Sequence, residues 1–179
     1  MNVGKRTIVL VVLVAVLMSL PFYSYEWNLF MHIFGAIVFV GNMIVTAVWV
    51  TFARRSGEPD ILRFAVRGVI GTDVYFTTPG FLLVLLNGGI LGTGWFRSGQ
   101  ASWIWTAIGL FVLSGIVWFA VLIPVQLRMD RIASAEGGAG EDLPPEFYPL
   151  LARWYRWGGA ATFLPLAALI IMVLKPRFW

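Results

Sequence analysis

The chain has 179 residues, of which 59% are hydrophobic and only 12% are charged. A soluble domain of this length cannot bury so much apolar surface, so the composition excludes that class and indicates an integral membrane protein. Cysteine is absent, which excludes a disulfide framework, an iron–sulfur cluster and a thiolate metal site. The formal net charge is +4, but the basic residues lie at the ends of apolar segments and form no patch, so we expect the lipid bilayer and no nucleic acid as a partner.

Five apolar segments follow one another along the chain, each close to or longer than the ~20 residues that cross a bilayer. They span residues 7–23, 27–53, 62–87, 102–127 and 149–174. Lys5 and Arg6 precede the first segment as in a signal peptide, but no small-residue cleavage site follows, so we interpret it as an uncleaved signal-anchor helix. The sequence therefore predicts an all-α membrane bundle, in which residues 1–179 form one domain with this anchor and a four-helix core within 27–176.

The distribution of basic residues predicts the orientation of this bundle. With five spans and the N-terminus inside, 10 of the 13 lysines and arginines fall on the inner side and 3 on the outer side. If the first segment did not cross, the split would be 8 against 5. Because cytoplasmic loops carry the excess of positive charge, we expect five spans, an inner N-terminus and an outer C-terminus. The predicted location is the bacterial cytoplasmic (inner) membrane, with a multi-pass topology.

Three connections between the segments are expected to be loops. Residues 54–61 predict a tight inner turn, with Pro59 suited to the first turn of the next helix. Residues 87–101 are rich in glycine and predict an outer loop, which lacks the lysine of a phosphate-binding loop and so has no nucleotide role. Residues 128–148 contain a Gly-Gly and a Pro-Pro pair and predict the longest inner loop, flexible enough to fold over the inner mouth of the bundle.

The second segment carries a polar stripe that includes the only histidine of the chain. Its members recur at spacings of 3, 4, 3, 4 and 3, which places them on one face of a helix: His32, Gly35, Phe39, Asn42, Thr46 and Trp49. In lipid, such a face turns toward protein, a cofactor or water. A neutral imidazole at His32 can ligate haem iron or copper, or relay protons. The alternative is a histidine that is held by a hydrogen bond to a neighbouring helix.

A haem at His32 would need its second axial ligand from another residue type or another molecule, because histidine occurs once. A methionine, a lysine, water or a histidine of another subunit would serve. Met172 and Lys175, at the outer end of the last segment, lie at a depth compatible with His32. Gly35 and Ala36 beside the histidine would let either a flat macrocycle or another helix approach closely.

The third segment places a carboxylate, Asp73, twelve residues from its start and therefore near the bilayer midplane. A carboxylate there is costly unless it is paired or protonated. Asn42 has a similar depth on the antiparallel second helix, so we expect a hydrogen bond between the two side chains. A proton-carrying or ion-binding carboxylate is a functional interpretation compatible with that bond.

Two threonines and a proline follow Asp73 on the same helix. Pro79 removes a backbone hydrogen bond and bends the helix, and the hydroxyls of Thr77 and Thr78 can return one. A buried polar site and a pure packing feature explain this group equally well. Arg67, nearer the inner end of the segment, is expected to reach lipid phosphates, or alternatively to support a buried acceptor.

Several strings within residues 27–176 resemble a family of bacterial predicted integral membrane proteins whose function is not established. They are Leu29 to Gly35, Thr72-Asp73 with Phe76-Thr77-Thr78-Pro79, Trp118 to Arg128, Leu143-Pro144-Pro145 with Tyr148, Trp154, and Met172 to Pro176. That family is distantly similar to the membrane domain of copper-resistance protein D and to the haem-binding bacterial protoporphyrinogen oxidase. Both place a histidine near the start of a core helix, where His32 falls. The resemblance implies a four-helix core able to hold a b-type haem.

The sequence has no H-E-x-x-H, G-x-S-x-G or Walker motif, so nothing in it indicates a hydrolase or a nucleotide-driven pump. Three hypotheses about function remain. The leading hypothesis is a haem-associated redox protein, with His32 as axial ligand in the outer half and Met172 as candidate second ligand. The second is a cofactor-free accessory or scaffold subunit of a larger membrane complex, or a homo-oligomer. The third is a small proton- or ion-coupled permease that uses Asp73, supported by Asn42, Thr77 and Thr78.

Overall fold

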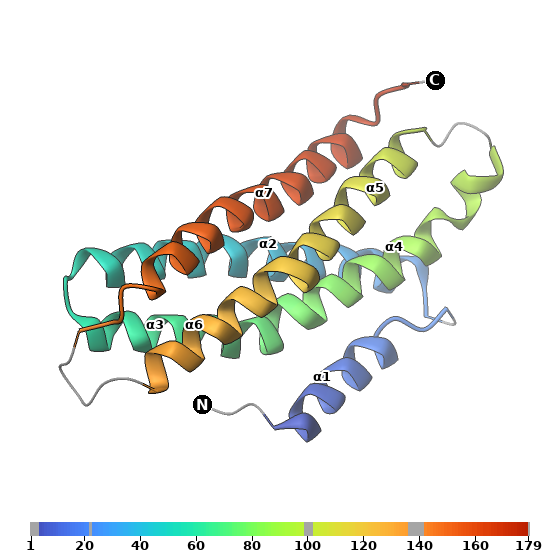
Figure 1. The fold of residues 1–179 in the computed structure, drawn as a ribbon. Coiled ribbons are helices and arrows are strands. Elements are labelled where there is room, and N and C mark those ends of the chain that lie inside the picture. Colours follow the sequence, from blue (N-terminus) through green and yellow to red (C-terminus); the bar gives the residue numbers. More distant parts are fainter. Residues whose placement is uncertain (1–3, 22, 99–101, 136–141, 179) are drawn as a thin grey trace.

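The computed structural model describes residues 4–21, 23–98, 102–135 and 142–178 (Figure 1). Every regular element in these ranges is a helix, which confirms the all-α prediction. In chain order the elements are α1 (Lys5–Leu17), α2 (Tyr25–Arg55), α3 (Pro59–Thr72), the π-helical turn η1 (Asp73–Thr77), α4 (Thr78–Ser98), α5 (Ser102–Val117), the π-helical turn η2 (Trp118–Leu122), α6 (Ile123–Ala135) and α7 (Phe147–Leu174).

Four helical stretches in the described part of the chain are long and apolar enough to cross a membrane. They are Tyr25–Arg55, Pro59–Phe96, Ser102–Ser134 and Phe147–Leu174. The helix of the first apolar segment is shorter than the 7–23 that the sequence predicts. With 13 residues, α1 is about 20 Å long, against a hydrocarbon core of about 30 Å. After Leu17 the Ser19 N–H donates to the Val16 carbonyl, one residue short of the α-helical partner, and the Ser19 hydroxyl donates to the Ala15 carbonyl instead.

The four long stretches form two antiparallel pairs. α2 packs along α3 and α4, and α7 packs along α5 and α6 (Figure 1). The main core joins the two pairs toward the α2–α3 turn, and its members include Val50, Leu62, Val66, Met129, Phe147, Leu151 and Trp154. In the middle of the bundle, the rings of Phe39, Phe81 and Phe111 pack with centroids 4.9 to 5.9 Å apart. The core is therefore continuous across all four stretches.

Glycines bring α2 and α4 into backbone contact. A Cβ added at Gly35 would lie 2.7 Å from the Leu83 Cβ, and one added at Gly80 would lie 2.9 Å from the Gly35 carbonyl oxygen. Small residues at a helix crossing allow this approach in membranes. The sequence predicts that either a flat macrocycle or another helix approaches closely at Gly35. In the structure, α4 is the close neighbour.

Each π-helical turn ends just before a proline and adapts the helix to it. Pro79 and Pro124 lack the N–H that an α-helix would use at that position. In η1 the Thr78 N–H donates a hydrogen bond to the carbonyl five residues earlier, that of Asp73. At the end of η2 the Ile123 N–H donates in the same way to the Trp118 carbonyl. The Thr78 hydroxyl also donates to the Asp73 carbonyl at 2.9 Å. The first residues of the two turns, Asp73 and Trp118, become partners in the site.

The predicted outer loop at residues 87–101 is wrong for most of its length, because α4 runs through it. The sequence suggests a loop from its glycines, but two of them, Gly88 and Gly92, make room for side-chain rings. A Cβ at Gly88 would lie 2.9 Å from the His32 ring, and one at Gly92 would lie 2.7 Å from the Phe96 ring. Since a membrane helix must keep its backbone hydrogen-bonded, glycine there serves packing more often than turning.

The predicted inner loop at residues 128–148 also begins later than expected, because α6 continues to Ala135. Its Gly-Gly pair at 137–138 lies outside the described residues. The predicted inner turn between α2 and α3 is confirmed: Pro59 begins α3, and Gly57 has a φ of 75°, which favours glycine.

Candidate functional site

The Asp73 carboxylate is the centre of a hydrogen-bond network that joins three of the four long helical stretches. Its Oδ1 accepts hydrogen bonds from Thr77 Oγ1 at 2.6 Å and from Asn42 Nδ2 at 3.3 Å. Its Oδ2 accepts hydrogen bonds from Trp118 Nε1 at 3.1 Å and from Gln126 Nε2 at 3.0 Å. The hydrogen bond that the sequence predicts between Asn42 and Asp73 is therefore present.

The two threonines after Asp73 take different positions. Thr77 is fully buried, and its hydroxyl oxygen also accepts a hydrogen bond from Asn42 Nδ2 at 2.8 Å. Thr78 keeps its hydroxyl on the backbone of its own helix and does not reach the carboxylate. The structure thus brings together Asn42, Asp73 and Thr77 and leaves Thr78 at the edge of the network.

The sequence-based reasoning missed two of the four donors, Trp118 and Gln126. A signal existed for Gln126, which is a polar residue inside the apolar segment 102–127, just as Asn42 is in the second segment. Trp118 gives no comparable signal, since a tryptophan in an apolar helix is ordinarily a packing residue. Its contact with Asp73 depends on the two π-helical turns, which no periodicity reveals.

The four side chains that surround the Asp73 carboxyl group are all neutral. The indole and amide N–H groups of Trp118 and Gln126 cannot accept a hydrogen bond, so Oδ2 acts as an acceptor, either in an ionised carboxylate or in an acid whose proton is on Oδ1. The ion pairs found among the described residues join Arg63 to Asp60 and Arg67 to Asp130, and neither includes Asp73. Hydrogen bonds from neutral groups stabilise the carboxylate but leave its charge uncompensated inside the apolar bundle.

A cavity of about 740 Å³ opens beside Asp73, between α3 with η1 and η2 with α6. Its lining includes side chains of four kinds: the charged Asp73, Arg67 and Asp130, the polar Thr78, Gln126 and Ser134, the aromatic Trp118 and Phe119, and the aliphatic Ile8, Ile70, Val74, Ile123 and Leu127. Because Ile8 belongs to α1, the short N-terminal helix forms part of the wall. We call this cavity the Asp73 groove.

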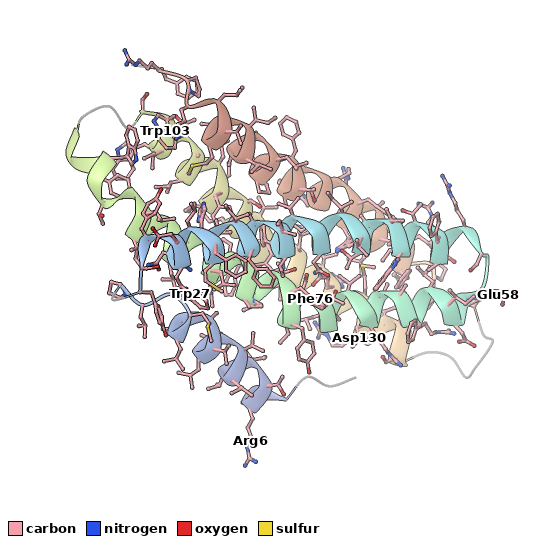
Figure 2. All side chains as sticks on the ribbon, turned by 180° about the vertical axis from the view of Figure 1, so that it is seen from behind. Arg6, Trp27, Glu58, Phe76, Trp103 and Asp130 are labelled. Carbon is pink, nitrogen blue, oxygen red and sulfur yellow. The ribbon has the colours of Figure 1, made fainter. Side chains whose placement is uncertain are left out.

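The far end of the Asp73 groove carries an ion pair. Arg67 Nε donates to Asp130 Oδ1 at 3.1 Å, and an Arg67 Nη donates to Ser134 Oγ at 2.8 Å. Arg67 thus pairs with Asp130 rather than with the lipid phosphates that its position predicts. Figure 2 shows Asp130 toward the end of the bundle that carries Glu58, away from the end with Trp27 and Trp103. The two side chains of the pair are 46% and 34% exposed, so this end of the groove is open.

His32 is held against the neighbouring helix, as the alternative interpretation of its stripe predicts. Its Nδ1 lies 2.9 Å from the Val84 carbonyl oxygen. Because a carbonyl only accepts, Nδ1 must carry the proton, and the neutral ring then presents a bare Nε2. Metal-ligating histidines are often oriented by such a bond. The same bond is equally typical of a histidine that only packs.

The residues of one chain do not fit a six-coordinate b-type haem at His32. Met172, the candidate second ligand, packs in the cluster of Trp103 and Ile104 instead, whereas His32 lies against α4. Lys175 lies over the rings of Trp95 and Trp103, with Nζ 5.8 and 5.5 Å from the ring centroids. Among the described residues, no group of three or more histidine, cysteine, aspartate or glutamate side chains is placed to hold a metal ion.

A comparison with protein families places the chain among its relatives. Residues 28–176 match the model of a family described as "Predicted integral membrane protein (DUF2269)". The chain belongs to this family. The match includes the four long helical stretches and the Asp73 network but begins after α1. No curated protein and no solved structure matches the chain. DUF2269 membership thus establishes an integral membrane protein and leaves its activity to be argued from the site.

Proposed function

We propose that this DUF2269 protein is a small proton- or cation-coupled permease whose working group is the Asp73 carboxylate. The observation that supports the proposal is a membrane-embedded carboxylate that accepts only neutral donors and lines an open groove. An uncompensated charge inside a membrane protein is costly, so a proton or a cation binds to it favourably. Ionisable residues within membrane segments commonly mark ion pathways and proton relays for this reason.

The same hydrogen bonds link the binding of a proton to Asp73 with the packing of the helices around it. If a proton bound to Oδ2, the new O–H would compete with the N–H groups of Trp118 and Gln126, and one of them would have to withdraw. Both lie on the stretch that contains η2, whereas Asp73 starts η1. Protonation at Oδ2 would therefore loosen the contact of Asp73 with η2 or α6, whereas a proton on Oδ1 would be donated to the Thr77 hydroxyl oxygen and leave both bonds in place. The other charged side chains that line the groove are Arg67 and Asp130, which neutralise each other.

The proposed topology is five spans with the N-terminus inside and the C-terminus outside, in the bacterial cytoplasmic membrane. The distribution of basic residues, 10 inside against 3 outside, supports it. The end of α1 is tied to α4, because Asn87 Nδ2 donates to Ser19 Oγ at 2.7 Å. In this orientation the open end of the Asp73 groove, with Arg67 and Asp130, faces the cytoplasmic side.

The proposal predicts that proteoliposomes exchange internal protons for external cations through Asp73. Wild-type protein is reconstituted in liposomes with an acidic interior and a trapped pH-sensitive dye, and Na⁺ or K⁺ is added outside. We expect an internal rise in pH that is faster than in protein-free liposomes, and its loss in Asp73→Asn. The asparagine retains an oxygen for Trp118 and Gln126 but carries no charge, so the fold is kept while the site is lost.

A haem-associated redox role is a second candidate, supported by the free Nε2 of His32 and by the resemblance to the copper-resistance and protoporphyrinogen oxidase membrane proteins. It needs a second ligand from outside the chain, such as His32 of another copy. The absorbance spectrum of protein purified after haem-replete expression tests it. This candidate predicts a Soret band that His32→Ala loses, and a wild-type spectrum with no such band contradicts it.

A cofactor-free accessory subunit is the remaining alternative. It predicts neither a cation-driven pH change nor a Soret band in a correctly folded protein. It also predicts that the protein leaves native membranes in mild detergent together with a stable partner, or as a homo-oligomer. That outcome would assign the Asp73 network to packing alone.

A further inference from the structure

The Asp73 groove is larger than the space that a bare inorganic ion needs. Its volume of about 740 Å³ lies within the range of about 300–1,000 Å³ that is typical of pockets for small organic molecules. A hard cation such as Ca²⁺ needs about six oxygen ligands in a close cage. In the described part of the chain no cluster of three or more metal-binding side chains is found, so Asp73 and Asp130 are too few to build such a cage.

The charges of the groove favour a cation over an anion. Asp73 and Asp130 provide two negative charges on its lining, and Arg67 provides one positive charge. Arg67 is already occupied by Asp130 Oδ1 and Ser134 Oγ, at 3.1 and 2.8 Å. An anionic ligand would have to break that pair, whereas a cation at Asp73 would break none of the ion pairs found among the described residues.

The remaining lining favours an organic body on that cation. Trp118, which contacts Asp73, and Phe119 both provide aromatic rings to the lining, and quaternary ammonium groups bind well to aromatic faces. The aliphatic side chains of Ile70, Val74 and Leu127 cover much of the rest of the surface. A carboxylate beside aromatic rings, in an otherwise apolar groove, is complementary to a positively charged head on an apolar body.

We infer that the Asp73 groove binds an organic ammonium ion with an apolar body, with the ammonium at Asp73 and the body along α3 and α6. The inference rests on the proposed function, because both assume that Asp73 is the cation site. It adds that the substrate is an organic ammonium ion. A free organic cation and the ammonium headgroup of a lipid share this chemistry. The first would enter from the open end at Arg67 and Asp130, and the second would enter from the surrounding bilayer.

Equilibrium binding to the full-length protein in a non-ionic detergent tests this inference. The probes are radiolabelled benzyltrimethylammonium, which represents a free cation, and a short-chain phosphatidylcholine as competitor, which represents a lipid headgroup. We expect saturable binding of the probe, weakened about tenfold or more in Asp73→Asn. Asp60→Asn removes a carboxylate from the same helix but outside the groove and serves as the matched control, with binding unchanged.

A second variant tests the groove independently of the charge. Leu127→Trp adds bulk to the lining and leaves the Asp73 network untouched, and Leu127 is exposed enough to accept a larger side chain. We expect it to weaken benzyltrimethylammonium binding, because the indole would occupy space in the groove. Displacement of the probe by the short-chain lipid would identify a headgroup as ligand, and binding without displacement would identify a free cation.

Two outcomes would overturn the inference, and they differ from failure of the proposed function. One is absence of saturable binding by either probe to folded wild-type protein. The other is binding that Asp73→Asn and Leu127→Trp leave unchanged. If Asp73-dependent proton exchange is nevertheless observed with Na⁺ or K⁺, the permease stands and only its substrate class is wrong. If binding depends on Asp73 but no exchange occurs, the groove is a binding site and the permease proposal fails.

Discussion

Replacing Asp73 by leucine is expected to lower the free energy of unfolding by about 2–6 kcal/mol. Leucine leaves the N–H groups of Trp118 and Gln126 without their acceptor, and each buried donor left unsatisfied costs about 1–3 kcal/mol. Asp73→Asn is the matched control, because its side-chain oxygen can accept from both donors and its amide can donate to Thr77. We expect the asparagine variant to stay within about 1 kcal/mol of the wild type.

Unfolding of both Asp73 variants in mixed micelles of a mild detergent and sodium dodecyl sulfate, followed by tryptophan fluorescence, measures this difference. Equal stability of the leucine and asparagine variants would show that the network contributes nothing to the bundle. The hydrogen bonds around Asp73 would then be incidental, and Trp118 and Gln126 would have no part in the site.

Replacing Gly80 by alanine is expected to destabilise the bundle by about 1–3 kcal/mol, the usual cost of forcing one extra carbon into a packed interior. The new Cβ would lie 2.9 Å from both the Gly35 carbonyl oxygen and the Phe39 backbone nitrogen, and backbone atoms cannot move aside as a side chain does. α2 and α4 would have to separate along their contact. Separation would also weaken the hydrogen bond between His32 and the Val84 carbonyl.

Gly89→Ala provides the control for this prediction. It lies on the same helix as Gly80, and a Cβ there would meet no atom within 4 Å. Thermal unfolding of both variants in the same detergent should show a lowered midpoint for Gly80→Ala and an unchanged or raised midpoint for Gly89→Ala, since alanine favours a helix over glycine. Equal midpoints would contradict a tight α2–α4 contact.

Much of the fold could be predicted from the sequence because lipid imposes simple rules. Apolar length and polar interruptions are enough to find the four long stretches and to turn Asn42 and Asp73 toward each other. The ends of helices are less predictable. Residues 87–101 have the glycine content of a loop, yet α4 continues to Ser98, and the His32 and Phe96 rings occupy the space beside Gly88 and Gly92.

The candidate site was only partly predictable for a related reason. Asn42 and Thr77 follow from depth and helical spacing, but Trp118 reaches Asp73 through two π-helical turns that shift the faces of both helices. The sequence pairs Met172 with His32 by depth alone, and equal depth in the membrane does not by itself place two side chains on facing sides of their helices. Met172 packs against Trp103 and Ile104.

Cation-driven proton exchange in proteoliposomes is the most direct test of Asp73 as the working group of the protein. The same preparation, with equal protein content, is made from wild type, Asp73→Asn and Asp60→Asn. We predict that added Na⁺ or K⁺ raises the internal pH for wild type and Asp60→Asn, and that Asp73→Asn behaves as protein-free liposomes do. An exchange rate that is the same in Asp73→Asn as in the wild type, or absent from folded wild-type protein, would contradict the account.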